Sequence, residues 1–323
     1  MPNLNVAVLA PPRYAKELGK PGTTSDITFY NLKRGETTVT FVVPARYPER
    51  LSSLFFAVSL ADTVILVVDE INAQFGECVM MLQSADRAKG RLVLRNSIAL
   101  DRIAPLISGT VLEHYAVMTD DPARLREDLL KEADRMAFRE RALTASRGGA
   151  VPIDHAYHVK GLGPVVLGCV ARGTVRKHET LHILPTEKQA QVRLIQKHDD
   201  DANAAFAGDR VGIALKNIET TDLDRGYVLS SDLSLQCSDV VTAKAALVKY
   251  WPAPMKEGMV LHIGHWMQFL PCRVTHVATG SDWRMPTLTL ALDAQLVFPP
   301  HARAVLHYLE GGKLRVAGTL KLQ

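Results

Sequence analysis

The sequence predicts one α/β domain followed by two all-β domains. The first 147 residues alternate short runs rich in Val, Ile and Leu with helix-like segments, a pattern that suits a parallel sheet covered on both faces. After residue 150 the helical periods give way to short strands separated by turns, which favours a β-sandwich or β-barrel. A second β-rich segment begins near Leu233. We therefore place the domains at residues 1–147, 148–232 and 233–323, which the chain length of 323 residues allows.

The first domain opens on an apolar run, Val6 to Ala10, which predicts a buried strand followed by a loop. Further strands are predicted by three apolar runs, TVTFVV (38–43), TVILVVD (63–69) and RLVL (91–94). The stretch DDPARLREDLLKEADRMAFRERAL combines an acidic cap, a proline in the first turn and apolar residues at helical spacing. It therefore predicts a long helix. The stretch SRGGA (146–150) follows and predicts a linker.

The composition is that of a soluble globular protein. Hydrophobic residues make up 47% of the chain and charged residues 22%. No apolar run is long enough to cross a membrane, and the N-terminal MPNLNVAV has no features of a secretion signal. The four cysteines are far apart, which predicts reduced thiols and a cytoplasmic location. The net charge of +4 permits contact with nucleic acid without demanding it.

Several features of residues 153–230 occur together and in order. A V-K-G-x-G-x-V-V-x-G opening is followed by a basic and then acidic turn, by AGDRVGIALK and by DLDRGYVL. This succession resembles the second domain of translation elongation factors of the Tu/1-alpha type. It is most similar to their SelB-like branch, which serves unusual aminoacyl-tRNAs. The later segments FLPCRVTHV, LVFPPHARAVL and LRVAGTLKL are similar to the third domain of the same family.

The first domain also resembles the GTPase domain of that family. GTTSDITFYN and SLADTVILVVDE stand where these factors carry the first switch segment and the strand after the second switch. The phrases SDIT, GEC and SGTVL are most similar to the archaeal EF-Pyl-like subgroup. The resemblance implies a degenerate P-loop GTPase-like α/β domain followed by two EF-Tu-like β-barrels.

The phosphate-binding loop of the family is not matched here. Such a loop needs glycines so that backbone N–H groups can surround the phosphates, then a Lys and a Ser or Thr. If Gly19 and Lys20 were the Gly-Lys pair of the motif, its first glycine would be Tyr14 and its Ser/Thr would be Pro21. Proline also removes a backbone N–H. We expect the helix after this loop to be largely deleted.

Two further nucleotide motifs depart from the family pattern. At the second switch, the Asp coupled to Mg²⁺ would be Val43 and the His that positions water would be Tyr47. The guanine-reading motif would fall on residues 95–98, with Ile98 in place of its Asp. Because phosphoryl transfer depends on such contacts, the sequence predicts a pseudo-GTPase with no cofactor. The alternative is a non-standard site for GTP and Mg²⁺ that uses Lys16, Lys20 and Thr24.

The resemblance also implies a pocket in the second domain for the aminoacyl-adenosine end of tRNA. By position its residues are Asp154, His155, Tyr157 and Arg210. Tyr157 suits stacking on an adenine, Asp154 or His155 an amino or hydroxyl group, and Arg210 a carboxyl or phosphate. The alternative is purely structural, with Tyr157 at the core edge and Arg210 in a corner salt bridge with Asp209.

Other candidate sites in the sequence are weaker. His262, His265, Cys272 and His276 lie near one another in the sequence, but their spacing fits no common zinc pattern. We therefore expect no metal site. We find no convincing nucleophile–base pair in the sequence, so an enzymatic activity other than a GTPase is not indicated.

These observations favour a SelB-like elongation factor paralogue that binds tRNA or another RNA through its β-barrels without a GTP cycle. The ribosome is a further candidate partner, no membrane partner is expected, and the oligomeric state is left open. One alternative is a GTP-dependent specialised elongation factor with an atypical nucleotide site. Another is a protein-interaction scaffold that reuses the fold.

Overall fold

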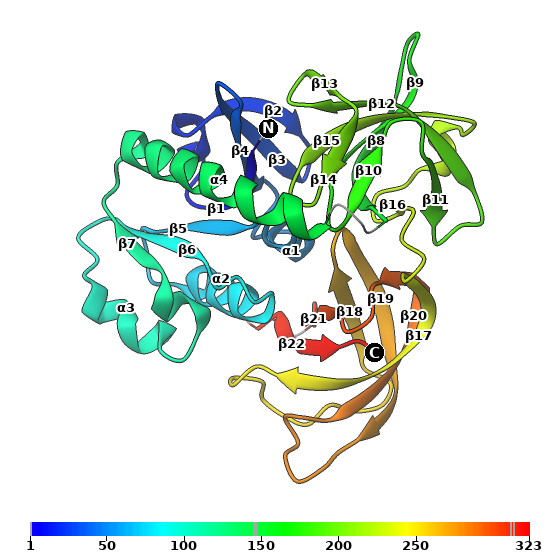
Figure 1. Cartoon of the computed structure of the whole chain (residues 1–323). Helices are drawn as coiled ribbons and strands as arrows, with labels where there is room; N and C mark the ends of the chain where they lie inside the picture. Colours follow the sequence, from blue (N-terminus) through cyan, green and yellow to red (C-terminus); the bar gives the residue numbers. More distant parts are fainter. Residues whose placement is uncertain (1, 145–147, 311, 313) are drawn as a thin grey trace.

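The computed structural model describes residues 2–144, 148–310, 312 and 314–323. An α/β domain, drawn from blue to green in Figure 1, packs against two β-barrels that follow it in the chain. This architecture confirms the predicted fold class. Within the described residues, no helix has the length and apolar character needed to span a membrane.

The first domain is built on a seven-stranded sheet with the order β2-β3-β4-β1-β5-β6-β7. Its strands are β1 (Asn3–Leu9), β2 (Lys20–Thr24), β3 (Ile27–Arg34), β4 (Thr37–Pro44), β5 (Thr63–Val68), β6 (Gly90–Leu94) and β7 (Ala116–Met118). Five neighbouring strands run parallel, as predicted; in sheet order they are β4, β1, β5, β6 and β7. The edge strand β2 and its neighbour β3 pair antiparallel, and β3 also pairs antiparallel with β4, so the expectation of a parallel sheet is wrong there. A tight turn at Gly35, with φ of 60°, reverses the chain between β3 and β4.

Helices cover both faces of this sheet. They are η1 (Tyr14–Glu17), α1 (Leu51–Ser59), α2 (Ala73–Ser84), α3 (Leu100–Ile107), η2 (Val111–His114) and α4 (Pro122–Thr144), where η denotes a 3₁₀ helix. Apolar residues of α4 pack on one face of the sheet, and α1 and α2 pack on the other. The predicted long helix is confirmed as α4, and Asp121 accepts hydrogen bonds from its first backbone N–H groups.

The second body is a barrel that follows α4 in the chain. Its strands are β8 (Ala150–Val159), β9 (Gly163–Cys169), β10 (Thr174–Arg176), β11 (Thr180–Leu184), β12 (Gln189–Lys197), β13 (Asp200–Ala202), β14 (Ala204–Phe206), β15 (Arg210–Lys216) and β16 (Val228–Ser230), with η3 (Thr220–Asp222) before the last. Pairing of β11 with β12 closes the main sheet. Within the predicted linker, residues 146 and 147 lie outside the described residues, whereas Gly148 pairs with Thr174 of the barrel.

The third body is a closed barrel with the strand order β17-β20-β19-β18-β21-β22. Its strands are β17 (Gln236–Leu247), β18 (Val260–His265), β19 (Gln268–Ala278), β20 (Thr287–Phe298), β21 (Arg303–His307) and β22 (Val316–Lys321). The chain positions of the predicted domain boundaries stay a prediction.

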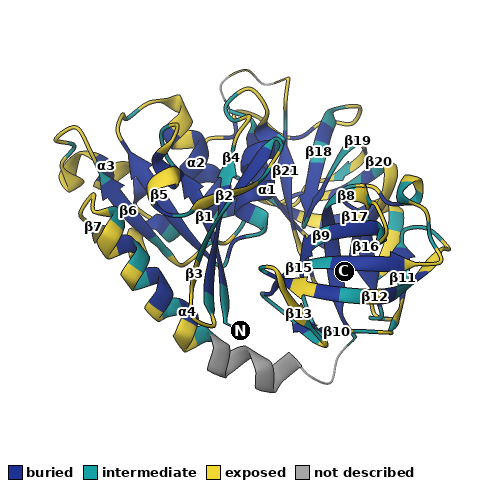
Figure 2. Cartoon of the chain, turned by 90° about the horizontal axis from the view of Figure 1, so that it is seen from above, coloured by how far each residue is buried: buried dark blue, intermediate teal, exposed yellow. Residues whose placement is uncertain are grey.

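The third barrel packs tightly against the first domain. Figure 2 shows buried strands on both sides of this junction. A Cβ at Gly264 would lie 2.6 Å from the Phe55 ring of α1, so the ring packs directly on the backbone of β18. Arg315 donates hydrogen bonds to both carboxylate oxygens of Glu77, at 2.8 and 2.5 Å. Apolar residues of this barrel belong to the same core cluster as α1 and α2.

Candidate functional site

The loop after β1 fills the space at the carboxyl end of this strand, where a phosphate-binding loop would lie. Its chain turns at Arg13, with φ of 76°, into the four-residue 3₁₀ helix η1. The Tyr14 side chain is buried, and its hydroxyl donates to Asp120 at 3.0 Å. Arg95 pairs with the other oxygen of Asp120 at 2.9 Å, and its guanidinium lies 6.0 Å from the centre of the Tyr14 ring. Burial and the bond to Asp120 raise the pKa of the Tyr14 phenol.

No α-helix stands between β1 and β2 in this described part of the chain. The N-terminus of an α-helix provides the oriented N–H groups that bind phosphate. The residual nucleotide candidates are also dispersed. Lys16 lies in η1, whereas Lys20 and Thr24 lie at opposite ends of the edge strand β2, and all three are exposed. Four residues of strand span about 13 Å, and β3 and β4 stand between β2 and β1.

Asp154 and Arg210 form a buried pair where the second barrel faces the first domain. Both Nη atoms of Arg210 donate to the Asp154 carboxylate, and Nη2 lies 3.0 Å from Oδ1. Burial alone would raise the pKa of Asp154, but the charge of Arg210 and the bonds from His155 and Arg210 hold that pKa below its usual range. Arg210 also lies 4.1 Å above the ring of Phe29 from β3. Asp209, the expected partner of Arg210, pairs instead with Lys197 at 2.6 Å.

His155 joins this pair to the turn between β2 and β3. Its Nδ1 lies 2.6 Å from Asp154 Oδ1, and its Nε2 lies 2.9 Å from the hydroxyl of Ser25. Arg225 reinforces the same turn, because its Nη1 lies 2.6 and 2.7 Å from the two carboxylate oxygens of Asp26. We call these six residues the interdomain polar network. Its members are Ser25, Asp26, Asp154, His155, Arg210 and Arg225.

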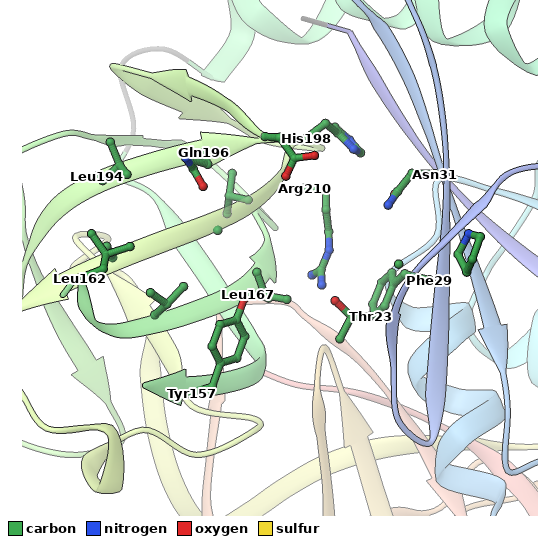
Figure 3. A pocket seen from close by; sticks show the side chains of 17 residues that line it. Thr23, Phe29, Asn31, Tyr157, Leu162, Leu167, Leu194, Gln196, His198 and Arg210 are labelled. Carbon is green, nitrogen blue, oxygen red and sulfur yellow. The ribbon is translucent and has the colours of Figure 1, made fainter. Parts of the chain in front are cut away.

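A cavity of about 370 Å³ opens beside this network, between the β2–β3 hairpin and the second barrel. Figure 3 shows Tyr157 and Arg210 on the barrel side and Thr23, Phe29 and Asn31 on the hairpin side. Tyr157 is 41% exposed, so its ring is available to a ligand. The structure thus brings Tyr157 and Arg210 to one cavity. Asp154 and His155 are not among its lining residues and instead support the wall.

Further contacts fix the first domain against the second barrel. The side-chain amides of Asn3 and Asn5 both donate to the carbonyl of Gly208 at 2.9 Å. His198 Nε2 lies 3.0 Å from Asn3 Oδ1, and burial lowers the pKa of His198 to about 4. Lys33 pairs with Asp200 at 2.7 Å on the surface. Each contact joins residues far apart in the chain.

The candidate metal ligands of the third barrel do not form a cluster. No group of three or more His, Cys, Asp or Glu side chains suited to a metal occurs among the described residues. His262 stacks on Phe269, with centroids 5.2 Å apart, and His265 contacts the carbonyl of Arg303. Cys272 is part of the barrel core, and exposed His276 lies 3.1 Å from a Glu257 oxygen.

Sequence reasoning missed Ser25 and Arg225. Ser25 stands in a predicted switch segment, and Arg225 stands in the family-like DLDRGYVL motif, so each had another explanation. Ser25 and His155 are 130 positions apart. No local pattern indicates such a contact, so it emerges only from the fold.

Comparisons with known proteins agree with this architecture. The family model described as elongation factor Tu domain 2 matches residues 163–230. The uncharacterized protein MJ0325 of Methanocaldococcus jannaschii is 33% identical over 311 residues, which cover 95% of each chain. The selenocysteine-specific elongation factor of the same organism is 26% identical over 278 residues, covering 80% of this chain but 59% of that protein.

Solved structures give the same result for the fold. The elongation factor SelB of Methanococcus maripaludis in its apo form has a TM-score of 0.79 at 20% identity, covering 99% of this chain and 79% of that chain. Its complex with the GTP analogue GPPNHP has a TM-score of 0.81 at 20% identity, with the same coverage. The chain is therefore a SelB-like member of the EF-Tu/EF-1-alpha family of translation elongation factors.

Proposed function

We propose that this protein is a pseudo-GTPase that binds the aminoacylated end of tRNA through its second barrel, without a nucleotide cycle. One observation carries the proposal. At the carboxyl end of β1, the Tyr14 ring and the Arg95–Asp120 pair occupy the position of a phosphate loop. A triphosphate needs a cradle of backbone N–H groups and a nearby cation. The Arg95 cation is already paired with Asp120, the buried phenol brings no backbone N–H groups, and Lys20 is removed from β1 by two strands.

The cavity between hairpin and barrel supports the second half of the proposal. Its volume of about 370 Å³ lies within the range of small-ligand sites. Tyr157 presents a partly exposed ring on which an adenine can stack, a contact worth about 1–3 kcal/mol. Apolar side chains of the barrel strands form much of the remaining wall, including Leu167 and Leu194. This lining suits the end of an aminoacyl group better than a bare anion, because Arg210 is already neutralised by Asp154.

The contacts between the domains support binding without a switch. In nucleotide-driven switches, contacts to the γ-phosphate order mobile segments and shift the population of conformations. Here the equivalent hairpin is tied to the barrel by protein groups, chiefly Arg225 on Asp26 and His155 on Ser25. We therefore expect the same affinity for tRNA with and without GTP.

Filter binding tests the proposal directly. Aminoacylated tRNA and the same tRNA after deacylation are titrated at physiological salt, each with and without GTP and Mg²⁺. We expect the aminoacylated form to bind more tightly and GTP to have no effect. Tyr157→Ala should weaken binding by about tenfold or more, in line with the loss of one stacking contact. Tyr250→Ala is the matched control, because Tyr250 is 59% exposed on the third barrel and lies outside the cavity.

Two results would contradict the proposal. Heat released on titration of GTP and Mg²⁺ into the protein, and lost in Lys20→Ala, would favour a GTP-dependent factor with an atypical site. Equal and negligible binding of both tRNA forms would favour a protein-interaction scaffold, whose partners would be captured equally well after ribonuclease treatment.

A further inference from the structure

Three side chains of the interdomain polar network are joined one to the next by hydrogen bonds. The Ser25 hydroxyl lies 2.9 Å from His155 Nε2, and His155 Nδ1 lies 2.6 Å from Asp154 Oδ1. Ser25 comes from the turn between β2 and β3, and the other two residues come from β8. The order hydroxyl, imidazole, carboxylate is the order of a serine nucleophile, its base and the group that orients the base.

The environment of Asp154 determines which ring nitrogen of His155 carries a hydrogen. Arg210 donates two hydrogen bonds to the Asp154 carboxylate, which is fully buried. An ionised carboxylate only accepts hydrogen bonds, so Nδ1 of His155 must carry the hydrogen that faces it. In the neutral imidazole Nε2 then has a free electron pair, which points to the Ser25 hydroxyl. Asp26 Oδ1 at 3.0 Å and the Ile27 carbonyl at 3.1 Å are alternative acceptors for that hydroxyl.

Two donors lie beside the same serine oxygen. Arg225 Nη2 and the backbone N–H of Ile27 each lie 3.3 Å from Ser25 Oγ. Arg225 is held in place by Asp26 and by the carbonyl of Asp154, which accepts from its Nε at 2.9 Å. Both donors point at the serine oxygen itself, so they hold Ser25 beside His155 and stabilise the negative charge that develops on that oxygen as its proton leaves.

The cavity lies next to Ser25, His155 and Asp154, which are not among the residues that line it. Thr23 and Phe29, which line the cavity, flank Ser25 on the two arms of the hairpin. The Phe29 ring meets the His155 ring edge to face at 6.3 Å. The His155 side chain is 16% exposed and Ser25 is half-buried, so neither is sealed from solvent.

We propose that Ser25, His155 and Asp154 act as a hydrolytic relay on the ester that links an amino acid to a ribose hydroxyl. The choice of substrate rests on the proposed function, since the cavity beside the relay is the one assigned to the acyl end. The relay would make the protein a deacylase of the aminoacyl-tRNA that it captures.

Each step of the reaction balances. Ser25 Oγ attacks the ester carbonyl carbon as its proton passes to His155 Nε2, and the carbonyl oxygen takes the electron pair. The bond to the ribose oxygen then breaks, and that oxygen leaves with the proton from His155. Water attacks the acyl-serine and gives a proton to His155, which returns it to the departing serine oxygen. The products are the free amino acid and tRNA with a free ribose hydroxyl.

The decay of aminoacyl-tRNA in the presence of excess protein tests the relay. We expect the wild type to accelerate hydrolysis over buffer and Ser25→Ala to reduce the acceleration by about 100-fold or more. Ser238→Ala is the control, since Ser238 is partly exposed in the third barrel and its hydroxyl bonds, within the described residues, only to the backbone of Val240. A protein that merely shelters the acyl end excludes water and slows the decay. Catalysis and shelter therefore change the rate of decay in opposite directions.

The role of Asp154 has its own readout. Asp154 acts through His155 as a positioning residue, because it touches the imidazole and not the substrate. An amide in its place can donate as well as accept, so Asp154→Asn no longer enforces the Nδ1–H form of His155. We expect this variant to change the pH profile of hydrolysis and not only its rate.

Reaction with a fluorophosphonate probe on the wild-type protein needs no variant and no tRNA. The relay predicts a single adduct on Ser25, detected by peptide mass spectrometry. Absence of the adduct, together with tRNA that binds but decays more slowly than in buffer, would overturn the relay and leave the proposed binding function intact. An adduct on Ser25 without any binding of tRNA would support the relay and contradict the proposed function.

Discussion

Arg225 holds the carboxylate of Asp26 with one nitrogen, Nη1, which lies 2.6 Å from Oδ1 and 2.7 Å from Oδ2. The pair joins the second barrel to the hairpin of the first domain, and the Arg225 side chain is less than one-third exposed. It is therefore better placed to fix the domains than the ion pair between Lys33 and Asp200, whose side chains are both more exposed.

Removal of this pair should loosen the contact between the first domain and the second barrel. Arg225→Ala leaves Asp26 partly buried without its cation, at a cost of about 1–3 kcal/mol. We expect faster cleavage by trypsin and a lower midpoint of urea unfolding. Lys33→Ala is the control and should change the free energy of unfolding by about 1 kcal/mol or less. Equal effects of the two substitutions would contradict this assignment.

The same pair predicts a sensitivity to acid. Burial would raise the pKa of Asp26, but the hydrogen bond and charge of Arg225 prevail and lower it. A carboxylate with a lowered pKa in the folded state contributes stability above its unfolded pKa, and that stability is lost as the pH falls through the folded value. The loss should therefore begin near pH 4 and grow below it. In Arg225→Ala this part of the pH dependence should be absent from the unfolding midpoints.

The buried pair of Asp154 and Arg210 should be costly to break from one side. Asp154→Ala leaves the Arg210 guanidinium buried without a partner, and we expect a loss of about 3–5 kcal/mol. Replacement of both residues by apolar side chains of similar size should recover much of that loss. Urea unfolding of the single and double variants measures the coupling, and strict additivity of the two changes would rule out a direct interaction.

Two buried histidines of the third barrel should weaken the protein at acidic pH. Burial lowers the pKa of His265 to about 4 and that of His307 to about 3. A histidine with a lowered folded pKa contributes full stability above its unfolded pKa of about 6.5. That stability is lost as the pH falls from there toward the folded value, because the unfolded chain binds more protons.

Thermal unfolding between pH 7 and pH 4 checks this expectation. His307→Phe should flatten the decline in unfolding temperature, because His307 packs with the rings of Phe55 and Phe269 and its Nε2 has no hydrogen-bond partner among the described residues. His276→Ala, at an exposed side chain, is the control and should leave the slope unchanged. A decline that is as steep in His307→Phe as in the wild type would contradict the role of this histidine.

The close approach of Gly264 to Phe55 predicts a steric defect that can be rescued. In Gly264→Ala the new methyl group would lie 2.6 Å from the aromatic ring, and overpacking of this kind costs about 1–3 kcal/mol. In a Phe55→Leu background the same substitution should cost less. Gly280→Ala is a suitable control, because no atom of the described part of the chain lies within 4 Å of a Cβ at that position. Identical costs in both backgrounds would exclude Phe55 as the cause.

Local sequence patterns predicted most of the secondary structure and the order of the domains. The apolar runs that became β4, β5 and β6 are buried on the faces of the sheet, so their composition reflects their position. The cap at Asp121 and Pro122 marked the start of α4 correctly. The β2–β3 hairpin was missed because its residues were assigned by resemblance to a switch segment.

The candidate site was predictable only in part. Tyr157 and Arg210 were found by resemblance, and they do line one cavity. The partners of the network depend on contacts between distant segments, such as Arg225 with Asp26 across 199 positions and Tyr14 with Asp120 across 106. Such contacts leave no periodic signal in the sequence, because only the assembled domains bring the two side chains together.

The contact between β18 and α1 also has a mechanical consequence. A barrel that meets a helix through a bare glycine backbone cannot roll along it without first displacing an aromatic ring. Any ligand that reorients the third barrel must therefore supply the free energy needed to break this contact. On this view the α/β domain sets the distance between the two barrels. A molecule that binds both barrels must match that distance.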